Sequence, residues 1–254
     1  MAIAPITDTK TAASNSLTNS STSSAAAQAA ASANPVVRAM GQAVNRIQTQ
    51  LDTTSAQLSS FGKLKSLVSE AQLASKALGG FTASSTGADV RTALSRFLIG
   101  VNTAVTTAKT TAALPGSAPA ESTSANRVSR DLMRSVTSNT ATADALKKIG
   151  FKAQSDGSFG WDGTKFDAAY KADPAAVRAT LAKLGQAVDT VATQELATNA
   201  TVSGSLTSLN QRATALKAQQ TSMLAVVQKL NAANSSNSGS TGYVNYGVSA
   251  YRSS

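Results

Sequence analysis

The sequence predicts a mainly α-helical protein in which long N- and C-terminal helices pair as an antiparallel coiled coil or bundle. Shorter helices, one small β-hairpin and disordered termini complete this prediction. Three observations lead to it. Apolar residues recur in steps of three and four near both ends of the chain, which places them on one helix face. Hydrophobic residues make up 42% of the 254 residues but aromatic residues only 4%, a balance that suits helices. Two short apolar runs flank an Asp-Gly turn at 156–157.

The N-terminal part divides into a disordered tract over 1–36 and a coiled-coil helix over 37–80. The tract is rich in Thr, Ser, Ala and Asn and shows no apolar periodicity, so burial cannot offset the entropy of ordering it. The helix ends at Gly79-Gly80, where glycine can adopt left-handed geometry. Its predicted interaction seam consists of Val44, Ile47, Leu51, Leu58, Phe61, Leu64 and Leu67.

Residues 81–184 are predicted to form a helical core. An amphipathic helix over 88–113 is broken by Pro115 and Pro119, and one or two shorter helices follow over 125–149. The Asp-Gly turn lies between short apolar runs, which predicts a β-hairpin near 151–161. Asp173-Pro174 then begins another helix, with proline at a favoured first position.

The C-terminal part is predicted as a coiled-coil helix over 185–231 and a flexible tail over 232–254. The tail is rich in Asn, Ser and Gly, has no helical period, and is expected to be disordered or to become ordered only on assembly. Alternating steps of four and three in the helix produce a heptad seam. Its predicted interaction residues are Val202, Leu206, Leu209, Leu216, Met223, Val227 and Leu230.

Two interpretations of these seams remain open. They can form an internal helical bundle, which is the more common use of a heptad stripe. They can instead bind sister subunits, an interpretation favoured here because unstructured tails flank both helices. On the second interpretation, replacing Leu209 and Leu216 by aspartate is expected to abolish assembly, since each change puts a charge into a desolvated seam.

The composition argues against an enzyme and predicts no catalytic, cofactor or metal site. The chain contains neither cysteine nor histidine, which removes thiolate nucleophiles, imidazole bases and most zinc ligand sets. The nearest carboxylate grouping is Asp156, Asp162 and Asp167, and turn and cap roles account for the first two. A calcium site there is disfavoured because the spacing does not match an EF-hand loop.

The net charge of +10 does not by itself identify a partner. Arg127, Arg130 and Arg134 would share one face of a helix, where a solvated or partner-facing stripe is the simpler interpretation. Nucleic-acid binding is disfavoured because no recognisable motif is present. No apolar stretch of about 20 residues predicts membrane insertion, and the N-terminus lacks the pattern of a cleaved secretory signal.

One segment resembles a known family. Residues 146–159 (LKKIGFKAQSDGSF), followed by Trp161-Asp162 and residues 165–169 (KFDAA), are similar to a segment of the flagellar filament-capping family, hook-associated protein 2. The continuation over 173–177, the helix over 223–231 and the segment 60–67 (SFGKLKSL) also resemble that family. The resemblance covers roughly 40–78 and 88–235 and lacks the large middle domains, so the chain looks like a reduced member.

The resemblance implies an extracellular structural component of the bacterial flagellum. It would assemble through its terminal helices as a reduced filament cap or hook-filament-associated protein, exported through the flagellar channel without a cleaved signal. Expected partners are further copies of itself, flagellin or hook-associated proteins, and an export chaperone. The strong positive charge departs from the neutral to acidic character expected of the family. An exported flagellum-associated adhesin or surface interaction protein is the alternative.

Overall fold

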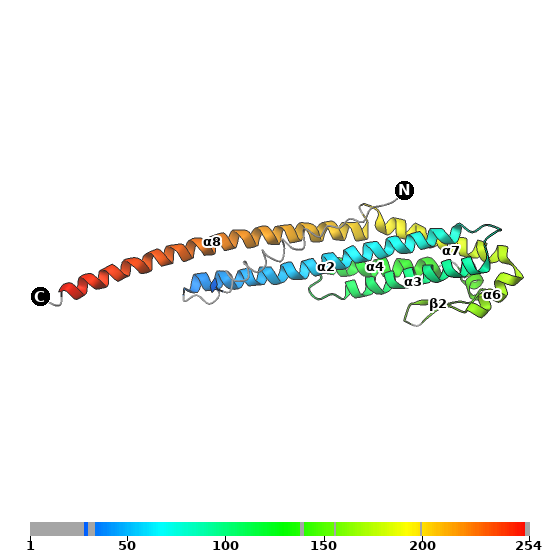
Figure 1. Ribbon diagram of the computed structural model, residues 1–254, viewed down its shortest axis with the longest axis horizontal. Helices are drawn as coiled ribbons and strands as arrows, with labels where there is room; N and C mark the ends of the chain where they lie inside the picture. Colours follow the sequence, from blue (N-terminus) through cyan, green and yellow to red (C-terminus); the bar gives the residue numbers. More distant parts are fainter. Residues whose placement is uncertain (1–27, 30–33, 138–139, 155, 199, 252–254) are drawn as a thin grey trace. The chain divides into compact units, whose positions relative to one another are not determined.

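The computed structural model describes residues 28–29, 34–137, 140–154, 156–198 and 200–251, with side chains described up to residue 233. The chain is mainly α-helical with one small antiparallel hairpin, which confirms the predicted fold class (Figure 1). The elements in chain order are α2 (Pro35–Gly79), α3 (Gly87–Ala112), α4 (Pro119–Thr137), α5 (Thr140–Lys148), β1 (Phe151–Ala153), β2 (Phe159–Trp161), α6 (Gly163–Ala172), α7 (Pro174–Leu196) and α8 (Thr201–Tyr251).

The chain forms two compact units. Unit 1 comprises Met1–Asp52 and Ala213–Ser254, and unit 2 comprises Thr53–Arg212. Each unit contains part of α2 and part of α8, the helices on which the sequence places the two seams. The two units therefore do not coincide with the five segments predicted from the sequence, because each unit combines parts of several segments.

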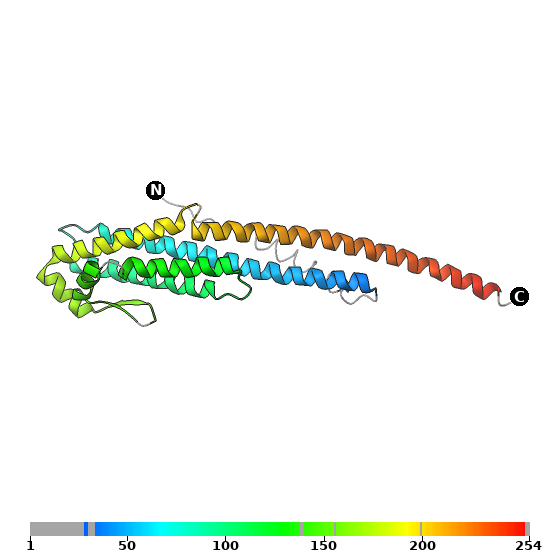
Figure 2. The same cartoon turned by 180° about the vertical axis from the view of Figure 1, so that it is seen from behind.

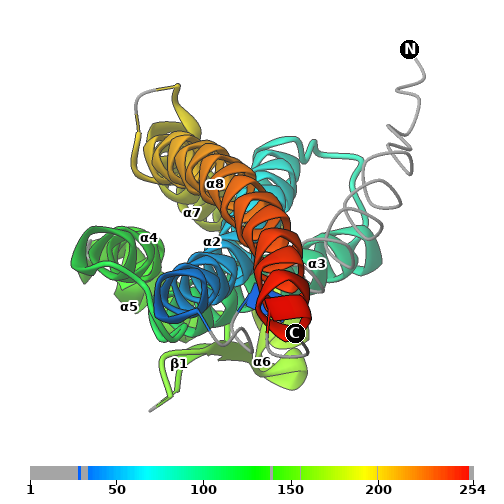
Figure 3. The ribbon, with the colours of Figure 1, turned by 90° about the vertical axis from the view of Figure 1, so that its left-hand side faces the viewer.

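Unit 2 is built on four helices that run antiparallel to their neighbours: the second half of α2, then α3, α4 and α7. Gly100 on α3 lies against Ala71 on α2. The side chain of Gln72 on α2 donates a hydrogen bond to Thr193 on α7 at 2.7 Å, and Lys76 pairs with Asp189 at 3.7 Å. Seen along the helices, α4 and α7 lie next to each other (Figure 3). The core between these helices includes Phe61, Leu64, Leu94, Phe97, Leu132, Leu181 and Leu184.

The α5–hairpin–α6 segment packs onto this bundle where α7 begins (Figure 2). The hairpin register pairs Phe151 with Trp161. The side-chain amide of Asn102 on α3 holds the hairpin in place: it donates a hydrogen bond to the Phe159 carbonyl at 2.7 Å and accepts one from the Phe159 backbone N–H at 2.8 Å. Gly150 enters the first strand with φ of +88°, a conformation that glycine adopts without strain. The hairpin predicted near 151–161 is confirmed.

Unit 1 contains an antiparallel pair formed by residues 35–52 of α2 and the part of α8 from Ala213 onward. Val37 and Val227 share a buried cluster with Ala29, and the side chain of Gln220 donates to Gln48 at 2.5 Å. Residue numbers rise along α2 as they fall along α8, which establishes the antiparallel direction. The predicted pairing of the two terminal helices is confirmed within this unit.

The shorter helices predicted over 125–149 begin earlier than expected, at Pro119, because proline is favoured in the first turn of a helix. Two further boundaries differ from the sequence prediction. The prediction of a single helix over 185–231 is wrong, because α7 ends at Leu196 and α8 begins at Thr201. The intervening Thr198-Asn199 has low helix propensity, Ala197 is extended, and the Ser203 hydroxyl donates to the Leu196 carbonyl at 3.4 Å. This bond satisfies one carbonyl that the end of α7 leaves free.

The second difference concerns the predicted tail. Residues 232–251 belong to α8, and no proline after Pro174 forces the helix to end at Asn231. Low propensity for Asn, Ser and Gly therefore did not set the boundary. The N-terminal tract over 1–36 falls outside the described residues except for 28–29 and 34–36, and so do residues 252–254.

The Gln48–Gln220 pair offers a prediction about register. Gln220 is buried in the seam of unit 1, where a polar residue specifies register at some cost in stability. We expect Gln220→Leu to raise the free energy of unfolding of unit 1 by about 1 kcal/mol while admitting shifted pairings. Thermal melting followed by circular dichroism measures the first effect.

The absence of cysteine makes the second effect measurable by crosslinking. A Val37→Cys/Val227→Cys pair reports the native register, and its disulfide yield should fall when Gln220→Leu is added. An unchanged yield together with unchanged stability would contradict the register role of the glutamine pair.

Candidate interaction sites

The carboxylates singled out from the sequence have structural partners. Asp156 accepts a hydrogen bond from the Ser158 backbone at 2.8 Å, and Asp162 caps α6 by accepting from the backbone of Thr164 and Lys165. Backbone hydrogen bonds lower the pKa of both carboxyls. Asp167 pairs with Arg91. The three carboxylates therefore stabilise the hairpin and α6.

Within the described residues, no group of three or more His, Cys, Asp or Glu side chains could hold a metal ion. Among the same residues, no helix is long and apolar enough to span a bilayer.

The structure places the fourteen predicted seam residues inside the chain's own two units. Eight are buried and six are partly buried, and none is exposed. Those in unit 1 are Val44, Ile47, Leu51, Leu216, Met223, Val227 and Leu230; those in unit 2 are Leu58, Phe61, Leu64, Leu67, Val202, Leu206 and Leu209.

This burial changes what the aspartate substitutions would test. Leu209 is fully buried in the core of unit 2 and Leu216 is buried in unit 1. A charge at either position would unfold its unit before it reported on contacts between subunits. Surface positions are needed to test assembly.

Of the three arginines predicted to share one helix face, one is engaged in ion pairs and two are exposed. Arg127 pairs with Asp131 at 3.3 Å and with the buried Glu195 on α7 at 3.7 Å. Arg130 and Arg134 are exposed. The three arginines therefore do not act as one uniform basic patch.

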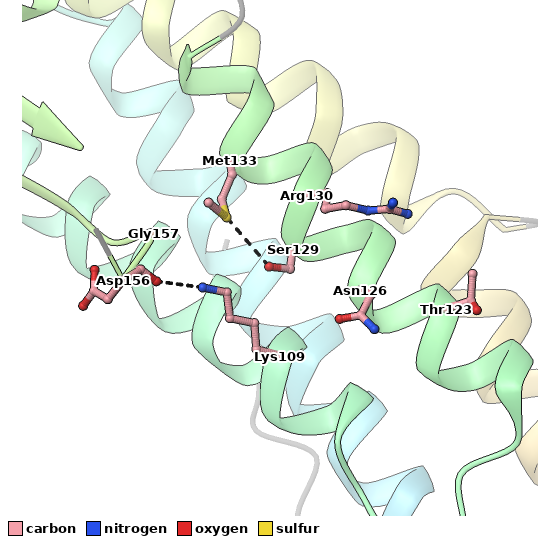
Figure 4. A pocket seen from close by; sticks show the side chains of 8 residues that line it. All are labelled: Lys109, Thr123, Asn126, Ser129, Arg130, Met133, Asp156 and Gly157. Atoms are coloured by element: carbon pink, nitrogen blue, oxygen red, sulfur yellow. Dashed lines mark hydrogen bonds between the residues drawn. The ribbon is translucent and has the colours of Figure 1, made fainter. Parts of the chain in front are cut away.

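The hairpin turn lines one side of an open groove between α3 and α4 (Figure 4). The groove has a volume of about 540 Å³. Lys109 donates to the Asp156 carbonyl at 2.8 Å, and a Cβ at Gly157 would meet the Met133 methyl at 2.8 Å. Arg130 extends away from Lys109. The remaining lining residues are Thr123, Asn126 and Ser129, and the contacts across the groove serve to dock the hairpin.

A second pocket, the α4–α8 pocket, has a volume of about 450 Å³. It lies between the first turns of α4 and α8, and small residues and hydroxyls form most of its wall. The lining residues are Ala120, Glu121, Thr123, Ser124, Arg127, Ala200, Thr201, Gly204, Ser205 and Ser208.

Two buried glutamates lie at this pocket: Glu121 is one of its lining residues, and Glu195 lies beside it. Glu121 is 7% exposed and Glu195 is 3% exposed, and one oxygen of each, Oε2, has no hydrogen-bond partner. Glu195 lies next to two lining residues, since it interacts with the Thr201 side chain and with Arg127. An unsatisfied buried carboxylate oxygen is costly, so both groups call for a physical explanation.

Sequence reasoning did not identify these two glutamates, although a signal was present. Glu121 lies on the stripe that continues through Ala125, Val128 and Leu132, and Glu195 continues the buried stripe of α7. A charged residue at a stripe position is informative because such residues are seldom buried without a partner.

Burial raises the pKa of the Glu195 carboxyl, because desolvation disfavours its charged form more than Thr201 and Arg127 favour it. The folded chain therefore holds this proton more tightly than the unfolded chain. Stability from this group is greatest below the ordinary pKa of 4.5 and is lost as pH rises through the raised value.

We expect Glu195→Gln to increase the free energy of unfolding at pH 7, with a smaller difference from the parent at pH 5.5. Urea unfolding followed by fluorescence of Trp161, the single tryptophan, measures both. The lowered pKa values of Asp156 and Asp162 keep those groups ionised across this range. Glu70→Gln, at an exposed position, is the matched control and should change little. Lower stability of Glu195→Gln at pH 7 would contradict the desolvation argument.

Comparisons with known proteins return no family assignment. The chain matches no protein-family model, no curated protein and no solved structure.

Proposed function

We propose that this protein is a structural axial component of the bacterial flagellum, related to the filament-capping family and acting as a reduced cap or hook-filament-associated protein. It assembles with copies of itself and with flagellin or hook-associated proteins, and a flagellar export chaperone accompanies it before export. No residue performs chemistry in this role.

The observation that carries the proposal is the segment 146–169, where the resemblance to the family is most specific. Its apolar positions enter the core of unit 2, through Leu146, Ile149, Phe151, Phe159 and Phe166. The positions that the family segment shares with this chain are therefore the ones that build α5, the hairpin and α6. If the resemblance reflects a common structural motif, these positions have to form a folded unit. Here they form a helix, a hairpin and a second helix.

The burial of the seam residues changes which surfaces are proposed to contact other subunits. Because the seam residues are covered within each unit, contacts between subunits are assigned to the outer, polar faces of the long helices. Large apolar side chains that remain exposed are few and scattered in the described part of the chain, at Val36, Leu73, Ile99 and Val226. The positive charge suits partners with acidic surfaces.

Export through the flagellar channel is testable in the native bacterium. Immunoblots of culture medium and cell fractions should find the protein outside wild-type cells and retained inside cells whose flagellar export apparatus is inactivated. A cytoplasmic protein measured in the same fractions controls for lysis. Undiminished surface display in cells that lack the export apparatus would contradict the proposal and favour the adhesin alternative.

A further inference from the structure

We propose that the α4–α8 pocket binds a primary ammonium group, with the carboxylate of Glu121 as its counter-ion. This inference goes beyond the structural role and does not depend on it. It rests on the burial of Glu121, on the local balance of charges and on the free space in the pocket.

Glu121 is nine-tenths buried and lines the pocket, yet its Oε2 has no hydrogen-bond partner. A carboxylate withdrawn from water loses hydration that only a strong donor or a positive charge restores. Its place in the first turn of α4 favours negative charge, because the partial positive charge of a helix lies at its N-terminus. The site therefore presents an anion that lacks a cation.

The nearby guanidinium of Arg127 is already engaged. It pairs with Asp131 at 3.3 Å and with Glu195 at 3.7 Å. The lining of the pocket therefore contains one carboxylate, Glu121, and one cation, Arg127, whose charge is shared with Asp131 and Glu195. No described residue forms an ion pair with Glu121 within 4.0 Å, so a cation from outside the described chain would improve the local balance.

The oxygen atoms around the pocket favour ammonium over the other common cations. Calcium takes six to eight oxygen ligands, commonly including several carboxylates, whereas Glu121 is the single carboxylate in the lining. A guanidinium is best matched by both oxygens of a carboxylate, whereas Oε2 is the one oxygen of Glu121 that is buried without a partner. An ammonium group has three rotatable donors, which one carboxylate oxygen and the hydroxyls of Ser205 and Ser208 can accept.

The pocket also has room for an alkyl chain behind the ammonium. A Cβ built at Gly204 would meet no atom within 4 Å, and the facing residues Ala120, Ser124 and Ala200 are small. Both a lysine side chain from another polypeptide and a small free amine have this chemistry.

The test is a titration of the full chain with n-butylammonium chloride, a mimic of the lysine side chain, at constant ionic strength. Amide chemical shifts of Ser124 and Gly204 should change and saturate. Glu121→Gln, which keeps the shape of the side chain, should weaken binding at least about tenfold, the effect of losing one charged hydrogen bond. Glu70→Gln, an exposed charge change, should bind as the parent does.

Two controls keep the result decisive. Tetramethylammonium, which has no N–H donor, should leave these amides unchanged, and an equal response to it would overturn the proposal. Ser208→Leu changes an exposed lining residue and should weaken binding by filling the pocket without disturbing the core. Non-saturating shifts in the parent, or parental affinity in Glu121→Gln and Ser208→Leu, would also overturn the proposal.

Sedimentation velocity then distinguishes the two sources of the ammonium group. Self-association that both n-butylammonium and Glu121→Gln abolish would assign the group to a lysine of a second copy. A monomer under all conditions, with saturable binding of n-butylammonium, would assign it to an amine of another molecule.

Discussion

Replacing Phe166 by alanine is expected to destabilise unit 2 by about 3–5 kcal/mol, the usual cost of removing a buried phenylalanine. Phe166 is fully buried and belongs to the core. Its ring meets Trp161 edge-on at 5.1 Å between centroids and stacks on Tyr170 at 5.9 Å. Its loss would leave a cavity between α6 and the hairpin, within the segment on which the flagellar proposal rests.

Trp161 makes this prediction easy to measure, because the single tryptophan touches the substituted ring. The midpoint of urea unfolding by Trp161 fluorescence should fall with little change in the slope. Leu73→Ala is the control, since Leu73 is 66% exposed and its loss should matter by less than about 0.5 kcal/mol. A loss below about 1 kcal/mol in Phe166→Ala would mean that α6 is not packed on the core.

Two glycine-to-alanine substitutions are expected to change stability in opposite directions. A Cβ at Gly185 on α7 would overlap the Ser75 carbonyl oxygen and lie 3.1 Å from the Cβ of Leu78, both on α2. Gly185→Ala should destabilise unit 2 by about 1–3 kcal/mol, because the two backbones must separate. Helix propensity alone predicts the opposite sign.

Gly62 supplies the matched control within the same unit. It lies in α2, and a Cβ there would meet nothing within 4 Å. Gly62→Ala should therefore stabilise unit 2 by about 0.5–1 kcal/mol through helix propensity. Both variants are compared with the parent by urea unfolding. Stabilisation by Gly185→Ala would contradict the close approach of α7 to α2.

Periodicity made much of this fold predictable. Steps of three and four identified the stripes that α2 and α8 bury, and the Asp-Gly turn identified the hairpin, because these signals depend on residues close in sequence. Periodicity could not decide whether the seams pack inside the chain or between subunits, because that depends on which helices contact each other. Helix contacts such as Gly185 against Ser75, and the anchoring of the hairpin by Asn102, join residues far apart in the sequence.

The α4–α8 pocket shows the same limit. Glu121 lies on an apolar stripe, which local sequence could have revealed, but its missing partner depends on the first turns of α8. The break between α7 and α8 was also missed, because the seam identified from the sequence begins at Val202 and no strong stop signal precedes it. A capped helix end without proline or glycine leaves little trace in the sequence.

The most direct test of the flagellar proposal is immunogold electron microscopy of intact cells of the native bacterium. Antibody raised against residues 125–184, a segment within unit 2, would be compared at the filament tip, shaft, hook junction and cell body. The proposal predicts label on flagella, at the distal tip for a reduced cap or at the hook junction for a hook-filament-associated protein. Label absent from flagella and present on the cell body would contradict it.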